Sequence, residues 1–216
     1  MPLPDRFTPK FYKMGVRALE VGAVFYKHGF FWVAEALELT RYFPKNLKEK
    51  IVSADDYKLP LAVRIRRVIE ELGPTYIKGG QIISSRPDLI PQDILKELSK
   101  LQDEVPPFPY DQVQELIEQE LNMPMDKVFR SFARRPIASA SIGQVHEAVL
   151  QDGQEVVVKV QRPNIEQMIQ LDTELMHLLA VHAEKRFTWA KLYNLVERVE
   201  EFTKTIRQEL DYTIEA

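Results

Sequence analysis

The chain has 216 residues, 45% of them hydrophobic and 28% charged, a composition typical of a globular protein with one or two domains. It contains no cysteine, which excludes disulfide frameworks and thiolate metal sites, and its four histidines show no metal-ligand spacing. Residues 1–105 carry 17 Lys and Arg against 14 Asp and Glu, whereas residues 106–216 carry 12 against 18. The two halves therefore look like different modules, and neither is basic enough to favour nucleic acid as a partner.

The N-terminal part predicts a helix over residues 10–43 with a broad apolar stripe. No stretch of the chain reaches the roughly 18 apolar residues that indicate a membrane-spanning helix, and the N-terminus lacks the pattern of a secretory signal. Residues 27–32 read Lys-His-Gly-Phe-Phe-Trp. This cluster predicts either contact with a membrane surface or packing against the rest of the protein.

Three further helices are expected before a stiff linker at residues 106–109, which read Pro-Pro-Phe-Pro. They cover residues 61–72, a segment beginning near Thr75, and residues 92–101. Beyond the linker, the pattern predicts one short helix, a group of strands and two long helices. Their ranges are a helix over 110–121, strands over 128–132, near 137, over 145–150 and over 156–161, and helices over 163–185 and from 189 towards 216.

The second of these segments contains Lys-Gly-Gly-Gln at residues 78–81, with Lys78 and Gln81 three positions apart on one helical face. Two glycines inside a helix cost about 1 kcal/mol each relative to alanine. Such a cost indicates that something approaches the backbone closely. A simple break between two helices is the alternative interpretation.

The loop 138–146 reads Ala-Ser-Ala-Ser-Ile-Gly-Gln-Val-His, and the strand that follows one hairpin later presents Lys159. A loop of small residues offering backbone N–H groups, followed by a strand lysine, is how a kinase-like lobe covers a nucleotide. Only Gly143 is free to adopt a positive φ, so we expect the loop to hold phosphates differently from a glycine-rich loop. Val157 and Lys159 face one side of their strand, and a lysine along a buried face needs an anionic partner. A plain turn and a lysine that reaches solvent are the alternatives.

The last helix contains three acidic candidates. Asp211 and Glu215 are four residues apart and share a helical face, whereas Glu209 is rotated by roughly 200° from Asp211. One of the two facing acids could pair with Lys159, as a helix glutamate pairs with the strand lysine in kinases. A solvated acidic face is the alternative.

In this order, the elements resemble the UbiB/AarF-type atypical kinase family, also called the ADCK group. Residues 78–81 match its Lys-x-Gly-Gln motif, residues 138–146 are similar to its alanine-rich loop, and residues 209–211 fit its Glu-x-Asp motif. The resemblance covers residues 60–216 and implies a set of site residues. The nucleotide-binding set is Ala138, Ser139, Ala140, Ser141, Ile142, Gly143, Gln144, Lys159 and Glu215, and the regulatory set is Lys78, Gly80, Gln81, Glu209 and Asp211.

The resemblance implies an α+β fold, with a helical extension over residues 1–105 followed over 106–216 by the small lobe of a protein-kinase-like fold. It implies Mg-ATP binding, ATPase or phosphotransferase chemistry, and support of ubiquinone or other prenylquinone metabolism at a membrane. Lys78 and Gln81 would reach into the cleft, meet the Glu-x-Asp acids and disfavour phosphorylation of other proteins. The expected partners are a nucleotide, a membrane surface or prenyl lipid, and quinone-biosynthesis proteins. The expected location is peripheral membrane or cytoplasm in a bacterium, or an organelle in a eukaryote.

One departure from the family pattern matters. The family's catalytic-loop Asp and Asn and its Asp-Phe-Gly follow the last helix, and this sequence contains no Asp-Phe-Gly. We therefore expect an extension and a small lobe without the large lobe, and assign no catalytic residue and no metal ligand within the chain. The leading hypothesis is the N-terminal part of an ATP-dependent enzyme. A non-catalytic nucleotide-sensing or lipid-surface module and a purely structural helical adaptor are the alternatives, and the absence of a Gly-x-x-x-x-Gly-Lys-Ser/Thr string disfavours a P-loop NTPase.

Overall fold

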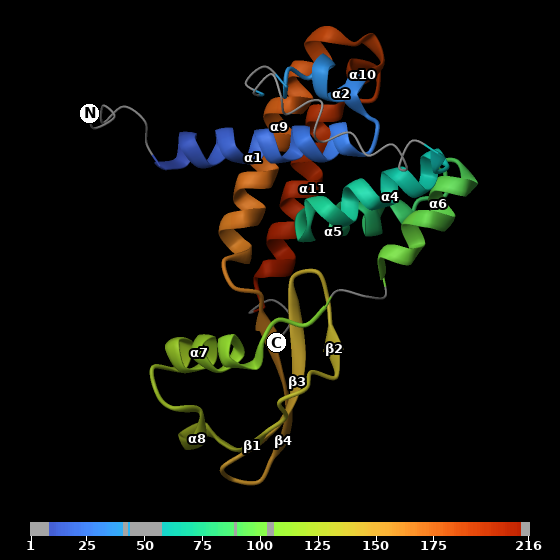
Figure 1. Ribbon diagram of the computed structural model, residues 1–216. Coiled ribbons are helices and arrows are strands. Elements are labelled where there is room, and N and C mark those ends of the chain that lie inside the picture. Colours follow the sequence, from blue (N-terminus) through green and yellow to red (C-terminus); the bar gives the residue numbers. More distant parts are fainter. Residues whose placement is uncertain (1–8, 41–42, 44–57, 89, 103–105, 213–216) are drawn as a thin grey trace. The chain divides into compact units, whose positions relative to one another are not determined.

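A computed structural model describes residues 9–40, 43, 58–88, 90–102 and 106–212. The chain forms two compact units, a helical unit of residues 1–101 and 167–216 and a sheet unit of residues 102–166. This division differs from the predicted boundary at residue 105, because the segment from 167 onwards groups with the N-terminal helices. The predicted α+β class and the order of helices followed by a small antiparallel sheet are confirmed (Figure 1).

The helical unit is built from short and long helices separated by residues with positive φ. Gly29 (φ 78°) lies between the first two helices, Gly73 (φ 96°) between the next two, and Asn194 (φ 48°) before the last. The expected single helix over 10–43 is therefore two helices within the described residues. The bounds are α1 Pro9–Lys27, α2 Phe31–Ala36, α4 Leu61–Leu72, α5 Pro74–Ser84, α6 Gln92–Leu98 with the 3-10 turn Ser99–Gln102, α9 Ile165–Arg186, α10 Thr188–Leu192 and α11 Leu195–Leu210.

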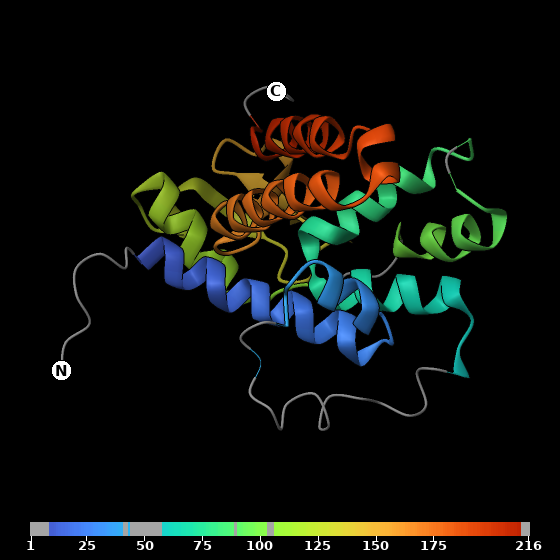
Figure 2. The ribbon, with the colours of Figure 1, turned by 90° about the horizontal axis from the view of Figure 1, so that it is seen from above.

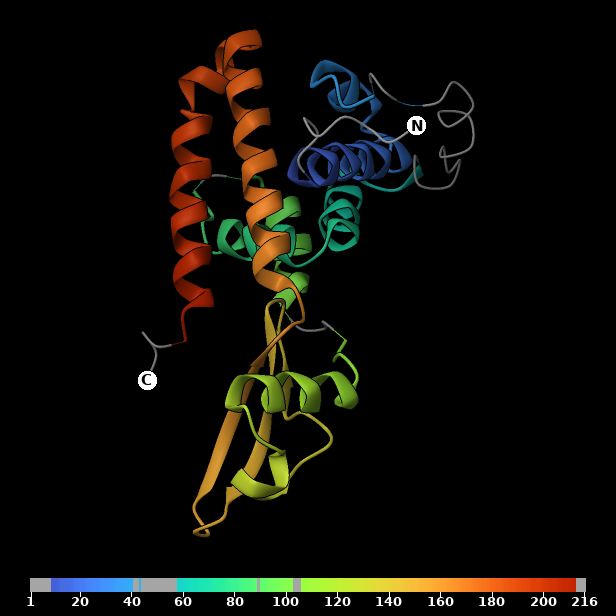
Figure 3. The same ribbon diagram turned by 90° about the vertical axis from the view of Figure 1, so that its left-hand side faces the viewer.

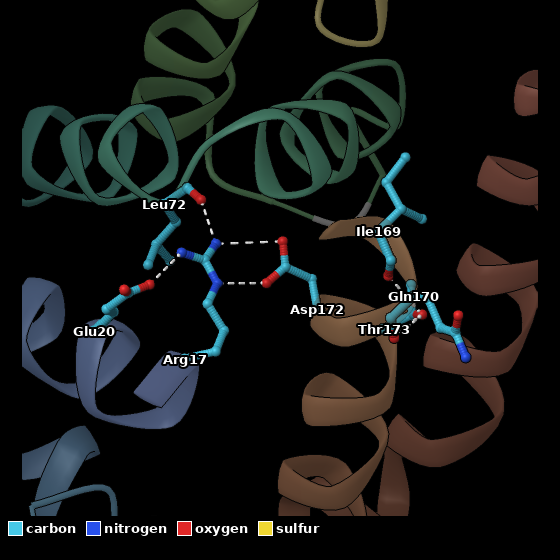
Figure 4. Close-up of polar contacts among 7 residues, drawn as sticks. All are labelled: Arg17, Glu20, Leu72, Ile169, Gln170, Asp172 and Thr173. Carbon is cyan, nitrogen blue, oxygen red and sulfur yellow. Dashed lines mark hydrogen bonds and ion pairs between the residues drawn. The ribbon is translucent and has the colours of Figure 1, made fainter. Parts of the chain in front are cut away.

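The core of the helical unit explains why α9 belongs with the N-terminal helices. Leu175 of α9 is buried in the same cluster as Val21 of α1 and Leu72 of α4. A polar contact ties the same elements together, since Arg17 Nε donates to Asp172 Oδ1 at 2.6 Å and Arg17 Nη2 donates to the carbonyl oxygen of Leu72 at 2.6 Å (Figure 4). Buried apolar contacts and a charge pair whose carboxylate is buried thus join three helices that are distant in sequence.

Helices α9 and α11 lie side by side, joined through the short α10 (Figures 2 and 3). Glu184 near the end of α9 accepts a hydrogen bond at 2.9 Å from the backbone N–H of Val196, one of the first N–H groups of α11. Such N–H groups have no partner inside their own helix and need one from elsewhere. The sequence pattern predicted one helix from 189 onwards, and the structure divides it at residues 193–194.

The aromatic cluster at residues 27–32 is divided between core and surface. His28 is buried, with Nε2 2.8 Å from Glu71 Oε2, and Phe30 is buried beneath the guanidinium of Arg64, 4.7 Å from the ring centre. Packing therefore accounts for these two residues, whereas Trp32 is 61% exposed. Among the described residues, none of the helices combines the length and the apolar character that a membrane crossing requires.

The sheet unit consists of four antiparallel strands and two helices. Strand β3 (Gly143–Leu150) pairs with β1 (Phe129–Phe132), β2 (Ala138–Ser139) and β4 (Glu155–Gln161), and the β3–β4 hairpin turns at Gly153 (φ 93°). Helix α7 (Tyr110–Leu121) lies along one face of this sheet and leads to the short α8 (Met125–Val128) (Figure 3). The buried residues between helices and sheet are Val113, Ile117, Met125 and Val160.

Candidate functional site

Within the described residues of the sheet unit, strand β4 has one face covered by α7 and one uncovered face. Val158 and Val160 pack against α7, whereas Val157 is 66% exposed and Lys159 is exposed beside it. The predicted alternation is confirmed, but the prediction that Lys159 lies along a buried face is wrong, because the covered face belongs to Val158 and Val160. Val145 of β3 stands directly opposite Lys159 in the ladder and so shares its face.

The loop before β3 is a tight turn. The backbone N–H of Ala140 donates to the carbonyl oxygen of Gly143 at 2.7 Å, and Ser141 and Ile142 between them are buried. Gly143 itself lies in β3 with extended backbone, and the positive-φ glycines of the described residues are those at 29, 73 and 153. Gly143, the loop residue that is free to adopt a positive φ, therefore does not use this freedom, and the loop turns without it.

Gln144, expected at the nucleotide, uses its side chain inside the protein. Its amide makes two hydrogen bonds to the backbone of Phe108 in the linker. The amide oxygen accepts from the N–H of Phe108 at 3.0 Å, and the amide nitrogen donates to its carbonyl oxygen at 3.3 Å. The amide nitrogen also lies 2.9 Å from Nε2 of His146, whose Nδ1 lies 2.7 Å from the carbonyl oxygen of Ala133. Both side chains are fully buried, so this network fixes the linker to the sheet.

Arg162 directly follows β4, and sequence reasoning did not single it out. Its guanidinium donates to the carbonyl oxygen of Ala140 at 3.1 and 3.2 Å, to Ser139 Oγ at 3.2 Å and to the carbonyl oxygen of Pro106 at 2.8 Å. It also lies 5.7 Å from the ring centre of Phe108. Burial lowers the pKa of Arg162. Its place directly after an apolar strand, and before Pro163, was the available signal; the helix predicted from 163 begins at Ile165.

Within the helical unit, one ion pair joins the two motifs that the resemblance implies to be regulatory. Lys78 Nζ of α5 lies 2.6 Å from Glu209 Oε1 of α11, with about a quarter of each side chain exposed. The helical-face argument left Glu209 unexplained unless the helix deviates from regularity there, and this ion pair gives Glu209 a partner. Helix α11 ends at Leu210, and Asp211 adopts an extended backbone (φ −88°, ψ 90°). Asp211 is therefore not part of a regular helix, so helical spacing cannot be used to place it on one face with later residues.

The other motif residues have different surroundings. Gln81 Nε2 donates to the carbonyl oxygen of Leu101 at 3.0 Å, so its amide is directed to the segment after α6 and not to the Glu-x-Asp acids. A Cβ on Gly80 would lie 2.5 Å from Leu101 Cδ1, which confirms the close approach predicted from the helical glycines. Asp211 lines a groove of about 850 Å³ between α1, α9 and α11. Glu215 lies outside the described residues.

Each unit thus carries one group of the expected site residues. The helical unit holds Lys78, Gly80, Gln81, Glu209 and Asp211, and the sheet unit holds the loop 138–144 and Lys159.

A family model described as the ABC1 atypical kinase-like domain matches residues 100–216, more than half of the chain. The chain belongs to this atypical kinase-like family. The match covers the loop, the strand lysine and the Glu-x-Asp motif of this ABC1-type chain, and it confirms the resemblance stated from the sequence.

Relatives of this ABC1-type chain include proteins named "Probable protein kinase UbiB". The one from Marinobacter nauticus is 47% identical over 159 residues, which cover 74% of this chain and 29% of the relative. The one from Azotobacter vinelandii is 48% identical over 176 residues, covering 82% and 31%. The chain therefore spans less than a third of the length of these relatives. A solved structure of the Rv3197–erythromycin complex from Mycobacterium tuberculosis is 32% identical, covers 68% of this chain and 37% of its own, and has a TM-score of 0.43.

Proposed function

We propose that the chain supplies the nucleotide-binding small lobe and the regulatory helices of an ATP-dependent atypical kinase or ATPase. The observation that carries this proposal is the uncovered face of the β3–β4 hairpin. There, Val145 and Val157 are diagonal neighbours, and Lys159 stands opposite Val145, two residue pairs along the ladder from Gly143 at the end of the loop. Apolar strand side chains suit a flat base, while an ammonium and a tight backbone loop suit phosphates.

Burial of loop side chains indicates which groups of the loop would bind the nucleotide and which would support the loop. The side chain of Gln144 is used by Phe108 and His146, so we assign to it the support of the loop. Ala138, Ser139, Ala140, Ser141, Ile142 and Gly143 would offer mainly backbone, and Lys159 a charge. Mg²⁺ would accompany the phosphates, with its carboxylate ligands supplied by residues outside this chain.

The Lys78–Glu209 ion pair supports the regulatory half of the proposal. It holds α5 on α11, next to the point where Phe202 of α11 lies 3.8 Å from the position of a Cβ on Gly79. An ion pair at this junction would keep the Lys-x-Gly-Gln helix closed on the Glu-x-Asp segment and disfavour phosphorylation of other proteins. Opening it would need only a modest free energy, because both partners are partly exposed.

Nucleotide binding is tested with the full 216-residue chain and Mg-ATP, by titration calorimetry. We expect Lys159→Ala to weaken ATP binding at least tenfold, because it removes the cation on the uncovered face. Lys127→Ala is the matched control, since Lys127 is an exposed lysine of the same unit on α8. Equal affinity of Lys159→Ala and the parent chain would refute the assignment of Lys159.

The physiological role we propose is support of ubiquinone or another prenylquinone at a membrane, because relatives at 47–48% identity carry the name UbiB. Quinone content of the source organism would be measured after deletion of the corresponding full-length gene. Complementation with the parent gene should restore the quinone, and complementation with the Lys159→Ala variant should not. Unchanged quinone in the deletion strain would refute this role.

A lipid-surface module is the second candidate, favoured by the exposed aromatic side chains of α1 and α2. Phe11 is 72% exposed, Tyr12 70% and Trp32 61%. The chain has two tryptophans, and the other, Trp189, is 54% exposed on α10, which allows an internal control. On anionic vesicles, Trp32 emission measured in Trp189→Phe should shift to the blue. Trp189 emission measured in Trp32→Phe should not shift, and the absence of any shift would refute a membrane contact through α2.

A further inference from the structure

Arg162 contacts the Ala138–Gly143 loop at the two residues that begin its turn. The guanidinium binds the carbonyl oxygen of Ala140 with two nitrogens, at 3.1 and 3.2 Å, and the hydroxyl of Ser139 at 3.2 Å. The same Nη2 donates to Pro106 in the linker at 2.8 Å. The loop, the linker and the end of β4 therefore meet at one side chain.

These contacts restrict the loop backbone. A peptide unit is planar, so holding the carbonyl oxygen of Ala140 also fixes the direction of the following N–H, that of Ser141. The N–H of Ala140 is itself used by Gly143. A second backbone bond, from the N–H of Arg162 to the carbonyl oxygen of Ile142 at 3.0 Å, closes the far side of the turn. Both ends of the turn are thus attached to Arg162.

Arginine suits this role better than lysine. A planar guanidinium presents several N–H groups in fixed directions, whereas an ammonium is a point charge on a flexible stem. The three acceptor oxygens, on Ser139 and Ala140 of the loop and on Pro106 of the linker, need several N–H groups in fixed directions. Because the contacts are to neutral oxygens in a partly buried place, they hold the loop without neutralising the charge of the arginine.

We propose that Arg162 is a positioning residue that holds the Ala138–Gly143 loop in one conformation and thereby sets the affinity for the phosphate groups of a nucleotide. The phosphate part rests on the proposed function, whereas the anchoring part stands on the contacts alone. In glycine-rich loops the conformation is free to adapt. Here alanine and serine restrict it, and Arg162 selects one of the remaining conformations.

The test uses the full chain with Arg162→Ala, Arg162→Lys and the milder Ser139→Ala. Arg135→Ala is the matched control, since Arg135 is an exposed arginine of the same unit. Hydrogen exchange of the amides of residues 138–144 is measured without nucleotide, and dissociation constants are measured for Mg-ATP and for adenosine. Thermal unfolding checks that each variant is folded.

We expect Arg162→Ala to raise loop exchange about tenfold and to weaken Mg-ATP about tenfold, because the competent loop conformation becomes a minor one. Adenosine, which has no phosphate, should keep its affinity within about twofold. Arg162→Lys should recover little of the parent's slow loop exchange and Mg-ATP affinity. Ser139→Ala should raise loop exchange and weaken Mg-ATP binding less than Arg162→Ala does, and Arg135→Ala should change neither.

Other outcomes overturn the proposal. Unchanged exchange with weakened ATP would mean that Arg162 contacts phosphate itself. Equal weakening of ATP and adenosine would mean a general structural role. If the parent chain binds neither ligand, the proposed nucleotide function and the phosphate part fall together, and the exchange measurement alone decides the anchoring. If Arg162→Ala does not fold, Ser139→Ala decides by the same criteria.

Discussion

Lys78 of α5 and Glu209 of α11 form an ion pair with a separation of 2.6 Å, and this pair joins two sequence motifs within the helical unit. The Lys-x-Gly-Gln motif and the Glu-x-Asp motif are therefore in contact through their first residues. Asp211 and Gln81, the last residues of the two motifs, have other surroundings, the groove beside α1 and α9 and the carbonyl oxygen of Leu101.

The ion pair should contribute measurably but modestly to stability. We expect a coupling of about 1 kcal/mol between Lys78 and Glu209, the upper end for pairs that keep some contact with water. The measurement is a double-mutant cycle of Lys78→Ala, Glu209→Ala and the double variant, followed by urea unfolding. Lys100→Ala combined with Glu209→Ala is the control cycle, in which no coupling is expected. A coupling near zero in the first cycle would contradict the contact.

The two motif glycines should respond differently to alanine. At Gly80 a Cβ would meet Leu101 Cδ1 at 2.5 Å and Ile69 Cγ2 at 3.3 Å in a buried place, so Gly80→Ala should destabilise by about 1 to 2 kcal/mol through overpacking. At Gly79 the nearest atoms are ring carbons of Phe202 at 3.8 Å, an ordinary contact. Gly79→Ala should therefore stabilise by about 0.5 to 1 kcal/mol through helix propensity.

Urea unfolding of the two single variants checks this prediction, and each glycine is the control for the other. In addition, Leu101→Val should recover part of the stability of Gly80→Ala, because it removes the atoms that the new methyl group meets. Equal effects at the two positions would show that helix propensity alone governs them.

The sequence predicted those elements whose ends carry strong local signals. The helices over 61–72 and 110–121 have the predicted bounds, because each follows a proline, carries a regular apolar stripe and ends at a residue that adopts positive φ, Gly73 or Asn122. The hairpin turn was predictable for the same reason, since Gly153 sits between two apolar runs. Local chemistry decides such features.

The candidate site was only partly predictable, because its contacts join distant segments. Arg162 and Pro106, for example, are 56 residues apart, and no local pattern relates them. The helical-face argument assumed a regular helix through Asp211, whereas α11 ends at Leu210. Arg162 was missed because its partners are mainly backbone oxygens, which leave no trace in side-chain patterns.

The buried charge pair should be the most sensitive polar contact of the helical unit. The side chain of Asp172 has no exposed surface. Burial alone would lower the pKa of Arg17, but the hydrogen bonds and charge of Asp172 outweigh burial and raise that pKa. Asp172→Asn should therefore cost about 3 kcal/mol, because it removes the buried anion of a largely buried guanidinium. Glu20→Gln removes an exposed partner of the same arginine and should cost less than about 0.5 kcal/mol. Urea unfolding compares the two, and equal costs would contradict the burial argument.

Glu71 should make the helical unit sensitive to acid. Burial opposes its ionisation, but hydrogen bonds from Lys27 and His28 outweigh this and lower its pKa below the ordinary value of 4.5. Because the folded pKa is the lower one, the stabilisation is complete above about pH 4.5 and is lost as the pH falls through the folded pKa. Glu71→Gln should therefore lose less stability than the parent between pH 6 and about pH 3, measured by urea unfolding. Glu197→Gln, at an exposed glutamate of α11, is the control and should follow the parent, and a Glu71→Gln curve parallel to the parent would refute the role of this carboxylate.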